Sequence, residues 1–270
     1  MKTRTNLKRL LKPLVRAIYY RLFRFQVRLR CYCADHFESR IDADIPLPPA
    51  MLRFRVTESA SAKEFVRIGR ACARLIDEQI VASGSVDLQH PARVLDFGCG
   101  CGRTITWFIR QYPKVEFHGA DVDTEAIQWC SQQFPKGRFI ANQPLPPLDY
   151  PDRHFDVVYC LSVFTHLNEE MQDAWLRELH RILKPGGLLI LTVHGQNATS
   201  EIAAEDLKVL HTAGFLHKKS RKLAGIVPDW YHTTWHSRDY IINRVSRWFH
   251  SPAYCEVPDG LQDLVVCKAN

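Results

Sequence analysis

The sequence predicts an α/β protein with a doubly wound, mostly parallel sheet that ends in an antiparallel hairpin. Short apolar segments alternate with amphipathic segments from residue 93 onward, which is typical of parallel strands joined by helices. Glycines cluster directly after the first of these apolar segments, at the position where open α/β sheets bind ligands. The turn residues Pro258-Asp259-Gly260 separate the last two apolar segments, Tyr254–Val257 and Leu264–Lys268, and this pattern predicts the hairpin.

The composition is that of a globular chain. The 270 residues are 46% hydrophobic and 24% charged, so a sizeable core can be buried, and no run approaches the roughly 18 apolar residues of a membrane span. The nine cysteines include no Cys-x-x-Cys motif, so we expect no metal site and a reduced, cytoplasmic chain.

The positive charge of the chain is concentrated at its N-terminus. Residues 1–30 contain ten Lys and Arg residues and no acidic residue, whereas the remaining 26 Lys and Arg are outnumbered by 29 Asp and Glu. Prolines follow at positions 46, 48 and 49, which is typical of a linker. We therefore expect a basic arm over residues 1–30, a linker over residues 31–60 and the α/β domain over residues 61–270.

The apolar pattern of the arm predicts an amphipathic helix. Apolar residues recur at three- and four-residue intervals between basic residues, at Leu7, Leu10, Leu14, Ile18 and Leu22. A secretory signal is excluded, since its apolar centre would carry no charges. A helix with a cationic and an apolar face binds the headgroup region of an anionic bilayer, so we expect a peripheral contact at the inner face of a membrane. The alternatives are a solvated tail, a nucleic-acid contact and a transit peptide.

The elements of the domain follow in order. Ser61 and Glu64 have the spacing of a capping box and begin a helix that stops near Gly84. Asn168 caps a later helix, which ends at the turn Lys184–Gly187. The expected strands are Arg93–Phe97, Val115–Val122, Arg138–Ala141, Phe155–Leu161 and Leu188–Val193.

A glycine-rich loop within the segment Val94–Arg103 is the strongest local signal for ligand binding, because glycines let the backbone approach a ligand closely. The dinucleotide fingerprint Gly-x-Gly-x-x-Gly requires glycine where this chain has Arg103, which argues against a nicotinamide-dependent oxidoreductase. Asp96 precedes the loop and suits a ligand with an ammonium group. Asp121 ends the second strand and can accept hydrogen bonds from both ribose hydroxyls; the alternative, a helix cap, is better filled by Asp123.

The chain resembles the class I S-adenosylmethionine-dependent methyltransferases over roughly residues 60–268. The resemblance rests on the glycine-rich loop, Asp121, the segment Ser162–Leu167 and the turn Lys184–Gly187, in this order. It implies a seven-stranded, Rossmann-like sheet with S-adenosylmethionine as the cofactor, whose ribose is held by Asp121. Val122 would pack on the adenine and Asn142 would lie near its edge. The residues that the resemblance assigns to cofactor binding are Asp96, Gly98, Gly100, Asp121, Val122, Asn142 and Leu161.

Methyl transfer requires an acceptor aligned with the sulfonium methyl, and a base only where the acceptor must lose a proton. The catalytic candidate is His166, which follows the fourth strand; a helix-start histidine bonded to the backbone is the alternative. His194 ends the fifth strand at the same sheet edge. Trp230, Tyr231 and His232 belong to an aromatic and histidine cluster that suits either a substrate pocket or a satellite core.

We therefore expect an enzyme that transfers a methyl group from S-adenosylmethionine to an oxygen atom of a small-molecule, glycan or lipid-linked acceptor. A nucleic-acid methyltransferase that uses the basic arm is one alternative. Against it, the body is acidic and no Asn/Asp-Pro-Pro-aromatic motif follows the fourth strand. The other alternative is a binding module that keeps the fold without turnover.

Overall fold

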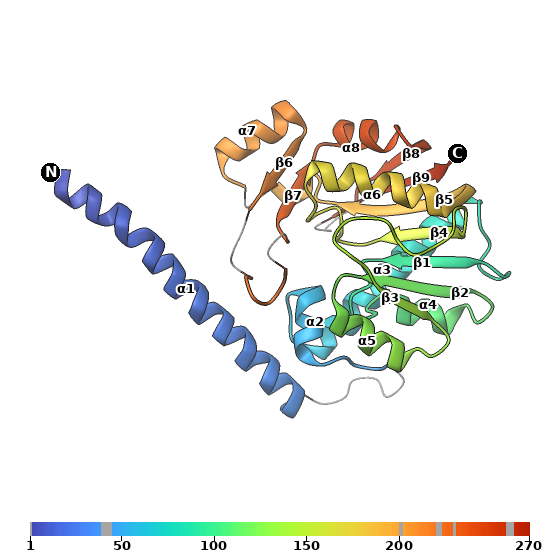
Figure 1. Cartoon of the computed structure of the whole chain (residues 1–270), viewed down its shortest axis with the longest axis horizontal. Coiled ribbons are helices and arrows are strands. Elements are labelled where there is room, and N and C mark those ends of the chain that lie inside the picture. The colour runs from blue at the N-terminus through green and yellow to red at the C-terminus, as the bar shows by residue number, and fades with distance from the viewer. Residues whose placement is uncertain (1, 39–44, 200–201, 220–222, 229–230, 258–261) are drawn as a thin grey trace.

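The computed structural model describes residues 2–38, 45–199, 202–219, 223–228, 231–257 and 262–270 of the chain. Seven strands of these residues form one sheet in the order β3-β2-β1-β4-β5-β9-β8 (Figure 1). Strand β9 runs antiparallel to both of its neighbours, and the other pairs are parallel, which confirms the predicted fold class. The strands are β1 (Arg93–Phe97), β2 (Glu116–Asp121), β3 (Arg138–Ala141), β4 (Phe155–Cys160), β5 (Leu183–Val193), β8 (Phe249–Cys255) and β9 (Asp263–Ala269).

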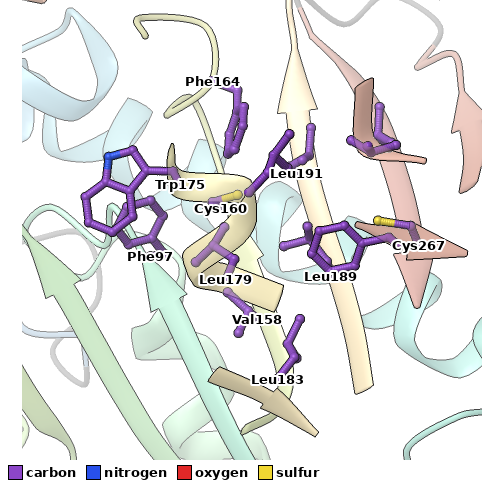
Figure 2. Packing of buried hydrophobic residues seen from close by; sticks show 14 of the residues in the cluster. Phe97, Val158, Cys160, Phe164, Trp175, Leu179, Leu183, Leu189, Leu191 and Cys267 are labelled. Carbon is purple, nitrogen blue, oxygen red and sulfur yellow. The ribbon is translucent and has the colours of Figure 1, made fainter. Parts of the chain in front are cut away.

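Each face of the sheet is covered by its own helices, because alternate side chains of a strand point to opposite faces. Leu95 and Val158 share one buried cluster with side chains of α6 and α8. Val94 and Val157 share the cluster on the other face with side chains of α3 and α4. Figure 2 shows part of the first cluster, in which α6 lies over the strands. The helices of the domain are α3 (Ala62–Ser83), α4 (Ile105–Gln111), α5 (Thr124–Gln133), α6 (Glu169–Ile182), α7 (Ala204–Ala213) and α8 (Arg238–Val245).

The helix ends follow the capping signals of the sequence. The Ser61 side chain accepts a hydrogen bond from the backbone N–H of Glu64 and begins α3, and Gly84 ends that helix at a φ of 60°. Asn168 caps α6 and Asp123 caps α5 in the same way. These caps were predicted because Ser, Asn and Asp oxygens satisfy the free N–H groups of a first helical turn.

The N-terminal region differs from the expected arm and linker. Helix α1 (Lys2–Phe37) continues well past residue 30, and a second helix, α2 (Ala50–Thr57), occupies part of the expected linker. Residues Ala50, Leu52 and Phe54 are buried. This segment is therefore a packed part of the body, and Pro49 marks the beginning of a helix rather than an irregular connection.

Two strands begin several residues away from the positions expected. Strand β5 begins at Leu183, directly after α6, because Leu183 pairs with Phe155 of β4 before the register shifts. The segment Lys184–Gly187 thus lies within the strand, with Gly186 at a φ of 75°. Strand β8 covers Phe249–Cys255 instead of beginning at Tyr254, and the predicted turn Pro258-Asp259-Gly260 lies outside the described residues.

The segment between β5 and β8 forms structure that the sequence pattern did not predict. A short helix, η1 (Gln196–Thr199), and α7 precede the antiparallel pair β6 (Phe215–Lys218) and β7 (Thr233–His236). Strand β7 also contacts the end of β5, where Trp235 bridges to His194. No helix of the described residues has the combined length and apolarity that would carry it across a membrane.

Candidate active site

A cavity of about 380 Å³ opens at the carboxyl ends of β1, β2 and β4. Its walls come from α2, the loop after β1, the ends of β2 and β4, and residues 225–228 with Tyr231 from the β6–β7 connection. This is the sheet edge at which β1 lies between strands whose connections leave in opposite directions, and open α/β sheets bind ligands at such a position.

The glycine-rich loop forms the floor of the cavity with two glycines in the left-handed region. Gly98 has a φ of 80°, and a Cβ atom there would lie 2.3 Å from Cγ2 of Val163. Gly100 has a φ of 51°, and its Cβ atom would lie 2.4 Å from Cγ1 of Val56. Both positions therefore require glycine for conformation and for space.

Asp121 faces this loop from the end of β2. Its Oδ2 atom accepts the backbone N–H of Gly100 at 2.7 Å, and its Oδ1 atom accepts that of Asp123 at 2.8 Å. A carboxylate offers about four acceptor positions, so these backbone bonds leave acceptor capacity for a hydroxyl donor from the cavity. The backbone bonds hold the carboxylate in a fixed orientation toward the cavity.

Asp96 is buried at the end of β1 and accepts a hydrogen bond from the Tyr159 hydroxyl at 3.0 Å. Burial raises the pKa of Asp96 to about 7, although the Tyr159 hydrogen bond and nearby Arg103 oppose this rise. A carboxyl group that ionises near neutral pH in a closed environment is suited to receive a cationic ligand group.

Val122, Asn142 and Leu161 line the same cavity as Asp121. The backbone N–H of Asn142 donates to the Asp121 carbonyl at 3.0 Å, and the Asn142 side-chain N–H donates to the Gln143 carbonyl at 2.7 Å. Its Oδ1 atom is buried and has no hydrogen-bond partner among the described residues. A buried acceptor of this kind favours a ligand donor, because a buried polar atom without a partner is destabilising.

His166 also lines the cavity, from the loop between β4 and α6. Its Nδ1 atom lies 2.6 Å from the backbone carbonyl oxygen of His232. Its ring stacks on the Tyr231 ring, with the two ring centroids 3.6 Å apart. A carbonyl oxygen only accepts, so Nδ1 carries the proton and Nε2 keeps its lone pair. Burial lowers the pKa of His166 to about 4, which leaves the ring neutral at neutral pH. The backbone contact and the cavity position, weighed above as alternatives, occur together.

Of the other substrate candidates, the structure places only some at the cavity. Tyr231 lines the cavity, but the side chains of His194 and His232 are not among its described lining residues. His194 donates from Nδ1 to the Thr234 carbonyl at 3.1 Å and so ties β5 to β7. The His232 ring packs near His217, and Trp230 lies outside the described residues.

Several cavity residues carried no signal in the sequence. Arg55 and Val56 line the cavity from α2, inside the expected linker. The Nη1 atom of Arg55 forms ion pairs with the carboxylates of Asp123 and Glu125, at 2.8 Å each. The partners lie far apart in the sequence, so no local pattern predicts these contacts. Arg103 was noted because it replaces a glycine, and its Nη1 atom donates to the Val56 carbonyl at 2.6 Å.

Comparison with known proteins agrees with this arrangement. A family model described as a methyltransferase domain matches residues 94–187, which contain most of β1, the glycine-rich loop, and β2, β3 and β4. Residues 94–187 are a class I S-adenosylmethionine-dependent methyltransferase domain. The cofactor of this methyltransferase domain is S-adenosylmethionine, and the resemblance stated from the motifs is confirmed.

Curated relatives and solved structures are similar to this methyltransferase domain. The chain is 31% identical over 116 residues to a malonyl-[acyl-carrier protein] O-methyltransferase of Halorhodospira halophila, an alignment that covers 42% of this chain and 38% of that protein. It is 30% identical over 101 residues to a fatty-acid O-methyltransferase of Mycolicibacterium smegmatis, covering 37% and 36%. The chain thus spans well under two thirds of these relatives.

Among solved structures, 1,6-didemethyltoxoflavin-N1-methyltransferase of Burkholderia thailandensis shares the fold with a TM-score of 0.53 and 19% identity. The match covers 86% of this chain and 98% of that one, which was solved with S-adenosylhomocysteine bound. The cavity described above fits the cofactor of the methyltransferase domain. It provides a glycine floor without Cβ atoms, a carboxyl group for an ammonium group, and a free Oδ1 acceptor on Asn142.

Proposed function

We propose that the chain transfers the methyl group of S-adenosylmethionine to an oxygen atom of a small-molecule, glycan or lipid-linked acceptor. One observation supports this more than any other: the neutral His166 ring faces the cavity with its Nδ1 proton engaged by the His232 carbonyl. Its Nε2 atom is thereby available as a proton acceptor. A base is required when a hydroxyl or carboxyl acceptor must lose a proton.

The cofactor residues divide by the chemistry of the groups they would hold. Asp96 would pair with the ammonium group, and Asp121 with the ribose hydroxyls. Gly98 and Gly100 would lie under the methionyl part. Val122 and Leu161 would pack on the adenine, and Asn142 would accept its amino hydrogen through Oδ1. The bound cofactor supplies an electrophilic methyl group on its sulfonium.

His166 would orient the acceptor and remove its proton. The stack on Tyr231 and the bond to the His232 carbonyl hold the ring in one plane, so no reorganisation is needed when an acceptor binds. A ring with a low pKa is a weak base, and it suits an acceptor that is already acidic or that loses its proton as the methyl group arrives.

The remaining wall of the cavity favours an acceptor with an apolar part. Val163, Ile226, Val227 and Pro228 line this wall together with the Tyr231 ring. An apolar wall with few polar groups binds apolar ligands and orients them through those few. The O-methyltransferases of malonyl-[acyl-carrier protein] and of fatty acids, to which the chain is similar, support an oxygen atom as the acceptor.

Incubation of cell extract with labelled S-adenosylmethionine and the protein tests this function. We expect a labelled small molecule, glycan or lipid, identified by its mass, and much less of this product with the Asp121→Ala variant at the same cofactor concentration. Loss of one or more charge-assisted hydrogen bonds should weaken cofactor binding by about 1.5–3 kcal/mol each. Label in nucleic acid, or cofactor binding without any labelled product, would contradict the proposal in favour of one of the two alternatives.

We further propose that the reaction takes place at the inner face of a membrane, which residues 1–30 contact. The outward face of α1 exposes apolar side chains, and residues 1–30 contain ten basic residues and no acidic residue. Each basic residue near an anionic surface contributes about 1 kcal/mol. The protein should therefore pellet with vesicles that contain phosphatidylserine and not with phosphatidylcholine alone. Retention on DNA without pelleting on vesicles would contradict this placement.

A further inference from the structure

Helix α1 has two opposed apolar faces between residues 15 and 37. Val27 and Cys31 are buried against the body, with Phe23 and Ala34 beside them. The opposite face is exposed at intervals of three and four residues, as in a helix that lies in the headgroup region of a bilayer. Its exposed side chains are Val15, Ile18, Leu22, Phe25, Leu29 and Tyr32. Figure 1 shows that α1 meets the body near its C-terminal end and leads away from it toward the N-terminus.

The inner face of α1 contacts the wall of the cavity directly. Val27 and Cys31 share a buried cluster with Ile226 of the β6–β7 connection. Ile226 also lines the cavity. The side chains of α1 therefore pack in the same cluster as Ile226, a residue of the cavity wall.

The C-terminal end of α1 provides the cap that α2 lacks. Pro49 precedes α2 and provides no side-chain cap. Instead, Oδ1 of Asp35 accepts the backbone N–H of Ala50 at 2.7 Å. A carboxylate at a helix N-terminus satisfies a free donor and interacts favourably with the helix dipole. The start of α2 is therefore held by a residue of α1.

Glu38, which directly follows α1, binds both α2 and α3. Its two carboxylate oxygens each lie 2.9 Å from the backbone nitrogen of Ala62 at the start of α3. Its Oε2 atom lies 3.3 Å from Nη2 of the buried Arg53, which belongs to α2. Arg53 also donates to the Pro48 carbonyl at 2.7 Å, so the segment before α2 is held as well.

Helix α2 connects the end of α1 to the cofactor site, because α2 contacts both. Arg55 and Val56 line the cavity. Val56 lies over the place where a Cβ atom of Gly100 would be. Its carbonyl accepts the Arg103 guanidinium at 2.6 Å. A shift of α2 would therefore move the cavity wall against the glycine-rich loop.

We infer that α1 is a positioning element of the cofactor site, so that contact of its outer face with an anionic bilayer raises the affinity for S-adenosylmethionine. This inference rests on the proposed function. A helix gains most of its stability from the packing of its apolar face, so α1 is stabilised further when its outer apolar face enters a bilayer. Because Asp35 lies in the last turn of this helix and Glu38 directly follows it, the bilayer increases the population in which α2 is held in place. Linkage then requires that cofactor and bilayer strengthen each other's binding by the same factor.

The test is calorimetry with S-adenosylhomocysteine on the full chain, in buffer and with vesicles of phosphatidylserine and phosphatidylcholine. For the unmodified protein we expect the affinity to rise about fivefold or more with vesicles. The double variant Leu22→Glu/Phe25→Glu should keep the affinity seen in buffer, lose pelleting and show no rise. Unchanged affinity of the unmodified protein while it pellets would overturn the inference and leave the proposed membrane contact intact.

A second double variant tests the capping end. Asp35→Asn/Glu38→Gln should pellet normally but bind S-adenosylhomocysteine about tenfold more weakly in buffer, as expected for two weakened caps. Its matched control is Glu64→Gln/Glu78→Gln, which removes two acids that pair with arginines on the exposed side of α3. Equal affinity of the two double variants would overturn the inference. If the capping variant does not fold, the titration of the unmodified protein with vesicles still tests the inference. Failure of the unmodified protein to bind S-adenosylhomocysteine at all would contradict the proposed function itself.

Discussion

The Nδ1 atom of His166 lies 2.6 Å from the backbone carbonyl oxygen of His232. The two residues belong to distant parts of the chain. The contact is supported by Thr234, whose N–H donates to the Thr165 carbonyl at 2.7 Å and whose hydroxyl donates to the Leu167 carbonyl at 2.8 Å. The β6–β7 connection thus selects the tautomer of the cavity histidine through a main-chain atom, and the histidine side chain at position 232 is not needed for it.

The His166→Ala variant should lose turnover and keep cofactor affinity. Loss of a general base costs about 10²–10⁴ in rate. The measurement is product formation at saturating S-adenosylmethionine, with S-adenosylhomocysteine affinity determined by calorimetry on the same sample. Unchanged turnover, or an unfolded variant, would show that His166 serves the structure alone.

Alanine variants of His194 and His232 are the matched controls for that experiment. Neither side chain is among the described residues that line the cavity, and the bond from His166 uses the carbonyl of residue 232, which alanine retains. Both variants should keep turnover within about threefold, because neither ring is among the described lining residues of the cavity. His194→Ala also removes the hydrogen bond to the Thr234 carbonyl, which should cost about 0.5–1.5 kcal/mol of stability. A loss in His232→Ala as large as that in His166→Ala would show that the ring itself acts in the reaction.

The Gly98→Ala variant should abolish cofactor binding. The added Cβ atom meets Val163 at 2.3 Å and strains a backbone at a φ of 80°, both at the floor of the cavity. Gly186→Ala is the matched control, because Gly186 also has a positive φ, 75°, but has no atom within 4 Å of the added Cβ. That control should cost about 1 kcal/mol of stability and leave affinity unchanged. Equal binding by both variants would contradict the assignment of this loop.

Cofactor affinity should rise with pH through neutrality. The pKa of Asp96 is raised to about 7 by burial, so below this pH the carboxyl is protonated and must release its proton to pair with an ammonium group. Affinity should fall by up to about tenfold per pH unit below 7. Calorimetry in buffers of different ionisation enthalpy would report the proton release, and Asp96→Asn should bind weakly with no such release. A flat profile for the unmodified protein would refute this role of Asp96.

The folded protein should lose stability as the pH falls from about 6.5. Burial lowers the pKa of His236 to about 3, so between pH 3 and 6.5 the unfolded chain binds more protons than the folded one. Each such histidine contributes up to about 1.4 kcal/mol per pH unit in this window, and the contribution is fully present above pH 6.5. Urea unfolding at pH 5 and pH 7 should show a smaller difference in His236→Gln than in the exposed control His250→Gln. Equal pH dependence in both would contradict the prediction.

The sequence by itself determined the sheet, the loop after β1 and the helix caps. Apolar periodicity and capping residues act over a few neighbouring positions, so they can be read without knowing the rest of the fold. The glycine-rich loop follows the first strand, and Asp121 ends the second. Because the carboxyl ends of neighbouring parallel strands lie at one edge of a sheet, the proximity of the loop and Asp121 was predictable.

The tertiary structure alone decided which distant residues complete the site. Arg55 and Val56 approach the glycine-rich loop because α2 packs into the body, and no local pattern distinguishes that helix from a proline-rich linker. His166 and His194 follow neighbouring strands, yet the cavity includes only the former among the described residues, because His194 turns to the carbonyl of Thr234 in β7. Such contacts depend on packing between segments far apart in the chain, and this information is absent from any short stretch of sequence.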